Sequence, residues 1–174
     1  MYKYTDVEIK KIIKSAIVVI DSREKEISHI LGYFDRQKIA YTHEKLAFGD
    51  YTLKIESPNT LRQFYLQDIC TVERKANLEE LSGNLCREKE RMDREFLRAR
   101  GTIHLLIEKA DYKDLINGKY NTQYSKEAFT AQLKAFEARY GLHITFLKDN
   151  SYSGQFIWQT LVYSLRESLI QGIF

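Results

Sequence analysis

The chain has 174 residues, enough to bury a sizeable core in one domain. Hydrophobic residues make up 44% and charged residues 29%, as in ordinary globular proteins, and the formal net charge is +3, which permits nucleic-acid binding without arguing for it. The sequence has no signal peptide and no apolar run that could span a membrane, so we expect no membrane association and no secretion.

Two cysteines, Cys70 and Cys86, make no metal-ligand pattern. They are expected to be reduced structural residues, which suits a reducing compartment. We therefore expect a cytoplasmic or nucleoid-associated protein, or a nuclear one in a eukaryote.

The first part of the chain predicts a helix followed by several strands. Residues 1–16 have amphipathic spacing with Thr5 or Asp6 as the cap, and they predict an N-terminal helix or arm that packs on the domain or covers a sheet edge or a partner. Residues 17–174 are expected to form a single domain. Its first elements are a buried strand over 17–20 that ends at Asp21, a helix over 26–38, strands over 41–46 and 51–55 joined by the turn Phe48-Gly49-Asp50, a loop at 57–59, and a buried strand over 69–74.

Helices and strands alternate in the second half. The expected elements are helices over 78–86 and 87–100, a strand over 102–107, a short helix over 111–117, a loop with Tyr120 and Tyr124 as surface, packing or base-stacking residues, a helix that begins after Ser125, a strand over 143–147, and a final helix from Ser153. This alternation is typical of an α/β fold in which a central mixed sheet is flanked by helices. The broad apolar face of the final helix serves either the core or a dimer interface.

The predicted helix over 87–100 carries a stripe of arginines. At 3.6 residues per turn, one side of this helix presents Arg87, Arg91, Arg94 and Arg98. Acidic residues flank the stripe, so it is either a DNA-binding surface that contacts phosphates or a solvated charged face.

The strand over 69–74 ends in Val72-Glu73-Arg74-Lys75. Because side chains alternate along a strand, Glu73 and Lys75 should point to one face and Arg74 to the other. Buried charges are costly unless they are paired or bind a metal. A carboxylate and an ammonium group at the end of an apolar strand therefore indicate either an ion pair or a site that holds a metal and a water.

Three blocks of the sequence carry a resemblance to a known family. They are Ile20-Asp21-Ser22-Arg23-Glu24, then Gly49-Asp50-Tyr51, then Val72-Glu73-Arg74-Lys75 followed by Glu79. In this order they resemble the pattern D-x-R-E, G-D and V-E-R-K-x-x-x-D of the nuclease domain of XPF-type (ERCC4-domain) structure-specific endonucleases. The similarity covers residues 17–146. Glu79 stands where the family usually has Asp.

The resemblance implies a restriction-endonuclease-like core with the active site at one edge of the sheet. It implies Mg²⁺ or Mn²⁺ as the cofactor, since both metals prefer oxygen ligands. Asp50 and Glu73 would be the main ligands, completed by Asp21 or Glu24, and Lys75 would orient the attacking water or stabilise the charge that develops on the phosphate. The outer positions of the site would be taken by Arg23, Arg74 and Glu79.

The implied function is metal-dependent cleavage of DNA, at branched or junction substrates such as flaps and forks. The tandem helix-hairpin-helix domain of many members is not in the sequence, so a homodimer or a second protein is expected to supply a further grip on DNA. The alternatives are a non-catalytic DNA-binding or scaffold subunit and a nuclease for linear duplexes or RNA ends. No P-loop is present, so no nucleotide cofactor is expected. A domain of this size would suit a phage or mobile element and a role in DNA repair or recombination.

Overall fold

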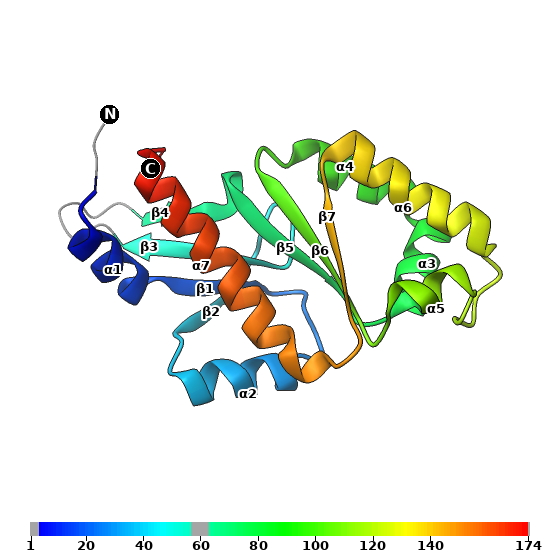
Figure 1. Ribbon diagram of the computed structural model, residues 1–174, viewed down its shortest axis with the longest axis horizontal. Helices are drawn as coiled ribbons and strands as arrows, with labels where there is room; N and C mark the ends of the chain where they lie inside the picture. The colour runs from blue at the N-terminus through cyan, green and yellow to red at the C-terminus, as the bar shows by residue number, and fades with distance from the viewer. Residues whose placement is uncertain (1–3, 57–62, 174) are drawn as a thin grey trace.

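The computed structural model describes residues 4–56 and 63–173. Within these ranges seven strands form one mixed sheet with helices packed around it (Figure 1). The strands are β1 (Ile17–Asp21), β2 (Tyr41–Glu44), β3 (Tyr51–Glu56), β4 (Gln63–Tyr65), β5 (Cys70–Lys75), β6 (Thr102–Glu108) and β7 (His143–Leu147). The predicted α/β class with a central mixed sheet flanked by helices is confirmed.

The helices fall into two groups along the chain. They are α1 (Asp6–Ser15), α2 (Ser28–Gln37), α3 (Leu78–Arg87), α4 (Lys89–Arg98), α5 (Tyr112–Ile116), α6 (Lys126–Tyr140) and α7 (Ser153–Gln171), with the short 3-10 turns η1 (Leu66–Asp68) and η2 (Asn150–Tyr152). Among the described residues, no helix is long and apolar enough to cross a lipid bilayer.

The order of strands brings three chain segments to one edge of the sheet. The order is β2-β1-β3-β5-β6-β7, with β4 beside β3. β3 runs antiparallel to both β1 and β5, whereas β5, β6 and β7 are parallel. Tyr51, the first residue of β3, therefore pairs with Ile20 near the end of β1 and with Val72 in β5. The loops that follow β1 and precede β3 meet beside the last residues of β5.

Two hydrophobic cores lie on the two faces of the sheet. On one face α1, α2 and α7 pack against β1, β3 and β5, and α7 crosses the sheet in Figure 1. On the other face α3 to α6 pack against β6. Leu106 belongs to the first core, whereas Leu105 and Ile107 belong to the second, as the alternation along a strand requires.

The N-terminal helix α1 is part of the first core. Thr5 caps it with a capping box that Glu8 completes, and Ile9 is buried against the same cluster as residues of α7. Residues 1–3 of the predicted arm and the predicted loop at 57–59 lie outside the described residues.

Several predicted boundaries are wrong. The break between the two helices predicted over 78–86 and 87–100 lies at Glu88, whose backbone (φ −129°, ψ 21°) is not helical, so Arg87 ends α3 and α4 begins at Lys89. Met92 and Phe96 of α4 are buried, and the ring centroid of Phe96 lies 5.5 Å from that of Phe136. β4 is not among the predicted elements, because three exposed residues give no periodic signal.

The tyrosines of the loop before α6 have a packing role. Tyr120 and Tyr124 each contact the ring of the buried Phe129, with centroids 5.2 Å and 5.6 Å away. Of the alternatives for this pair, the structure favours packing over base stacking.

Candidate active site

Glu73 and Lys75 lie side by side on one face of β5. Lys75 Nζ is 2.7 Å from Glu73 Oε1, and the two residues are only 9% and 8% exposed. Burial alone would lower the pKa of Lys75, but the charges of Glu73 and Asp50 outweigh it and raise this pKa above its ordinary value. The ammonium group of Lys75 therefore stays protonated and interacts with its acidic neighbours.

Asp50 meets this pair because of the register between β3 and β5. Tyr51 is paired with Val72, so Asp50 stands opposite Glu73, and the Asp50 N–H donates to the Val72 carbonyl at 2.9 Å. The Asp50 carboxylate accepts a hydrogen bond of 2.8 Å from the backbone N–H of Arg74. The carboxylate of Asp50 is thus held at the end of the ladder that carries Glu73.

Gly49 makes this approach possible. Its φ of +71° lies in the left-handed region, and a Cβ at this position would lie 2.8 Å from Thr71 Cβ. Only glycine accommodates both conditions without strain. The G-D pair in the sequence therefore has a structural cause.

The site concentrates negative charge. Burial raises the pKa of Asp50 well above its ordinary value, the charge of Glu73 raises it further, and Lys75 only partly opposes this. Two carboxylates in one partly dry site repel each other, and a cation between them would relieve the repulsion. The electrostatics thus favour binding of a further positive charge.

The residues present fit a divalent metal ion. Magnesium is commonly held by one or two carboxylates together with waters and substrate phosphates. Asp50 and Glu73 supply two such hard oxygen donors. Within the described ranges, however, no three Asp, Glu, His or Cys side chains are grouped closely enough to form a fuller cage.

Asp21 is engaged elsewhere. Its carboxylate accepts from Arg23 Nε at 2.7 Å, from the Arg23 N–H at 2.8 Å and from the Leu46 N–H at 2.7 Å. Burial would raise the pKa of Asp21, but these hydrogen bonds outweigh it and lower the pKa. Asp21 therefore lies beside the site, where its backbone N–H donates to the Asp50 carbonyl at 2.8 Å. Its carboxylate, however, is paired with Arg23.

Glu24 lies with Arg74 on the opposite face of β5. Arg74 Nη1 is 3.0 Å from Glu24 Oε1, and the hydroxyl of Tyr51 donates to the same oxygen at 3.1 Å. Of the predicted ligands, the structure brings together Asp50 and Glu73, and it pairs Asp21 and Glu24 with arginines.

The carboxylate that approaches Lys75 from α3 is Glu80 rather than Glu79. Glu80 Oε1 lies 3.9 Å from Lys75 Nζ, and Glu80 Oε2 accepts from the Ala76 N–H at 2.8 Å. Glu79 is exposed and accepts instead from the Asn121 N–H at 3.3 Å. The sequence analysis missed Glu80, although Asn77 and Glu80 form the N-x-x-E spacing typical of a helix start.

The arginine stripe is shorter than predicted. Arg87 ends α3, and only Arg91, Arg94 and Arg98 share α4. Arg91 is paired with Glu88 at 2.9 Å and with Glu95 at 3.2 Å, while Arg94 lies 3.9 Å from Glu90. Such surface ion pairs contribute little free energy, so they hold these arginines only weakly.

The fold and this site together define a nuclease-type domain, with acidic side chains and a lysine at the rim of a mixed sheet between two helical layers. The family model of the ERCC4 domain matches residues 20–159, and the chain belongs to this family. The resemblance to XPF-type nucleases found in the sequence is confirmed.

Solved structures support the same fold. The structure of XPF from Aeropyrum pernix matches with a TM-score of 0.60 and 18% identity, covering 87% of this chain and 66% of that one. XPF from Aeropyrum pernix in complex with DNA matches with the same score and coverage at 19% identity. The chain thus spans slightly less than two thirds of the length of these relatives. A search of curated proteins gave no match.

Proposed function

We propose that the protein is a metal-dependent DNA endonuclease that hydrolyses phosphodiester bonds. The observation that carries this proposal is the meeting of Asp50, Glu73 and Lys75 on one face at the rim of the sheet, with a raised pKa at Asp50. Membership of the ERCC4 domain family and the likeness to a fold that is known in complex with DNA support it.

Each of these residues would have its own task. Asp50 and Glu73 would hold Mg²⁺ or Mn²⁺, which when bound neutralises phosphate charge and lowers the pKa of a water. Lys75 would place its ammonium group against the negative charge that develops on the phosphate. Glu73 and Glu80 keep Lys75 in place, and the Arg74 N–H keeps Asp50 in place.

The proposed substrate is branched or junction DNA, such as a flap or a fork. The decisive experiment is a cleavage panel with a flap, a fork, a hairpin, a linear duplex and single-stranded DNA and RNA, each with Mg²⁺, Mn²⁺ or chelator. We expect metal-dependent cuts near the branch point. Binding of DNA without cleavage under every metal condition would instead indicate a non-catalytic DNA-binding subunit.

Glu80 and Glu79 allow a matched comparison within one helix turn. We expect Glu80→Gln to lower the cleavage rate about tenfold, because Lys75 loses one of the two carboxylates that it pairs with. Glu79→Gln should change the rate by less than about twofold, because Glu79 only holds the loop at Asn121. Single-turnover cleavage rates at saturating metal measure both. A larger loss of cleavage rate in Glu79→Gln than in Glu80→Gln would indicate that Glu79, and not Glu80, fills the acidic position that follows V-E-R-K in the family.

The arginines of α4 make a separate prediction. The double substitution Arg91→Ala/Arg94→Ala should reduce the slope of log affinity against log salt by about one to two, because each lost phosphate contact removes close to one counterion. Fluorescence anisotropy with a labelled fork between low and moderate salt gives this slope. Arg166→Ala is the control, because Arg166 is a partly exposed arginine of α7 that pairs with Glu167. An unchanged slope in the double variant would leave α4 as a solvated charged face.

A further inference from the structure

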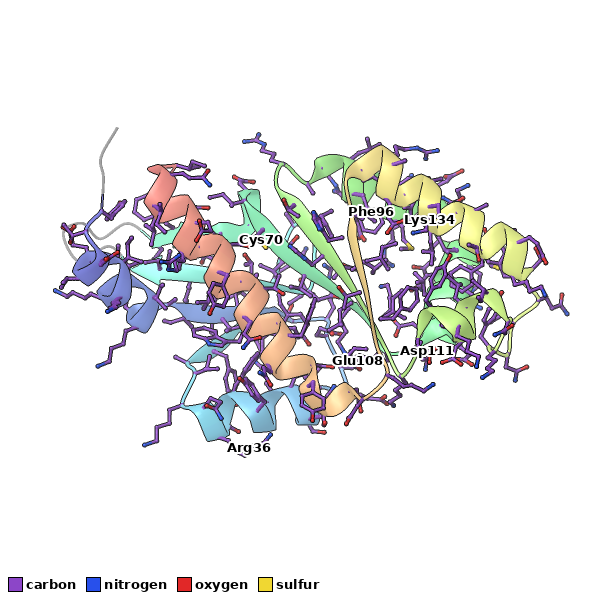
Figure 2. All side chains as sticks on the ribbon, viewed as in Figure 1. Arg36, Cys70, Phe96, Glu108, Asp111 and Lys134 are labelled. Carbon is purple, nitrogen blue, oxygen red and sulfur yellow. The ribbon has the colours of Figure 1, made fainter. Side chains whose placement is uncertain are left out.

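Behind the candidate site, on the opposite face of β5, lies a buried group of charges that catalysis does not use directly. The guanidinium of Arg74 is held between two carboxylates, Glu24 at 3.0 Å and Glu108 at 3.1 Å. Glu108 is fully buried at the end of β6, close to the start of α7 (Figure 2). The Arg74 side chain is 5% exposed, so water contributes little to its solvation.

This charged group connects several elements. The second oxygen of Glu108 lies 2.8 Å from His29 Nε2 on α2. Burial would raise the pKa of Glu108, but the nearby Arg74, Ser153 and His29 outweigh it and lower the pKa. Arg74 is therefore connected to β6 and α2 through Glu108, and to the segment that follows β1 through Glu24.

Such a network is a poor source of stability. Replacing a buried ion pair by apolar side chains of similar size is often neutral or stabilising, since desolvation offsets the attraction. Apolar residues fill neighbouring positions of the same core, with Val72 on β5 and Leu106 on β6, opposite Arg74. Ion pairs are directional, so they fix the position of the residue that they hold more closely than apolar contacts do.

Arg74, the residue that these ion pairs hold, also binds the carboxylate of Asp50. The backbone N–H of Arg74 donates to Asp50 Oδ2 at 2.8 Å, so a shift of Arg74 along or across the sheet displaces the carboxylate of Asp50. We propose that Glu108 is a positioning residue of the active site, which fixes Arg74 from behind the sheet and thereby the hydrogen bond that orients Asp50. The inference rests on the proposed function insofar as Asp50 is a metal-binding residue.

The test uses Glu108→Gln, which keeps the shape of the side chain and removes its charge. Without metal, amide hydrogen exchange should become about tenfold faster at Arg74, because the ion pair that holds its side chain from behind is lost. Exchange at Leu105 and Ile107, on the other face of β6, should stay within about twofold of wild type. In calorimetry, Mn²⁺ should bind about tenfold more weakly.

Two further variants make the result specific. Glu44→Gln removes a partly exposed ion pair, with Lys54 at 2.7 Å near the edge of the sheet, and should change neither readout. His29→Asn removes support from Glu108 at a partly exposed position and should move both readouts in the same direction by about threefold. This variant decides the question if Glu108→Gln does not fold.

Faster exchange confined to Arg74, together with weaker Mn²⁺ binding, would establish the positioning role. Uniformly faster exchange in all strands, or unchanged exchange at Arg74, would overturn it and leave Glu108 as a structural residue. If wild-type protein binds no Mn²⁺, the proposed function fails, whereas the exchange data without metal still decide whether Glu108 positions Arg74.

Discussion

The substitution Asp50→Asn is expected to abolish metal-dependent cleavage, with a loss of about a thousandfold or more, and to leave the protein at least as stable as wild type at neutral pH. The loss follows because a metal ligand contributes several kcal/mol to the transition state, and each 1.36 kcal/mol is tenfold in rate. The fold survives because an asparagine carbonyl oxygen can still accept the hydrogen bond of the Arg74 N–H.

The stability gain has a defined sign. The folded protein raises the pKa of Asp50 above its ordinary value of 3.8, through burial and the charge of Glu73. The folded state therefore holds this proton more tightly than the unfolded state, and wild type loses stability as the pH rises from about 3.8 towards the folded pKa. The variant has no such loss, so its advantage grows over this window and is complete above it.

Denaturant titrations of both proteins from pH 4 to 8, together with cleavage of a fork in Mg²⁺, measure the two effects. Asp68→Asn is the control, because Asp68 is exposed in η1, and both activity and stability should stay at the wild-type level. If Asp50→Asn cleaved DNA at the wild-type rate, Asp50 would not be a residue of the active site. A marked loss of stability would mean that its charge serves the fold.

The substitution Lys75→Met is expected to affect both activity and stability. Removing the ammonium group leaves Glu73, which is 8% exposed, without its 2.7 Å partner and beside a second carboxylate. Breaking a buried pair in this way costs about 3 to 5 kcal/mol. The cleavage rate of the folded fraction should fall about a hundred- to a thousandfold, because a positive group aimed at the reacting phosphate is lost.

Metal should rescue the stability of Lys75→Met but not its activity. A divalent cation between Asp50 and Glu73 would replace the missing positive charge, and binding to the folded state raises its stability by mass action. Thermal unfolding with and without Mn²⁺, alongside single-turnover cleavage, tests this.

Lys54→Met provides the matched control, because Lys54 pairs with Glu44 at the same 2.7 Å distance. That variant should lose stability, keep full activity per folded molecule, and show no added response to Mn²⁺. If the two lysine variants showed the same activity, stability and response to Mn²⁺, Lys75 would have only a structural role in its ion pair with Glu73.

Most elements of the fold could be predicted because their signals are local. Apolar runs marked β1, β5 and β6, and Ser125 and Gly141 marked the ends of α6. The break between α3 and α4 was predicted between residues 86 and 87, and the structure places it at Glu88, whose backbone is not helical.

The sequence by itself determined the facing of the residues in β5. Side chains alternate between the two faces of any single strand, so Glu73 and Lys75 must point to one face of β5 and Arg74 to the other. The three spaced blocks also sufficed to identify the family, which the match over residues 20–159 confirms.

Only the tertiary structure decided which acids meet. Asp50 reaches Glu73 through the register of β3 on β5, whereas Asp21 is taken by Arg23 and Glu24 by Arg74. The physical reason is that a carboxylate goes to whichever N–H groups and cations surround it, and strand pairing brings those from distant parts of the chain. Local spacing fixes the direction of a side chain, but the fold chooses its partner.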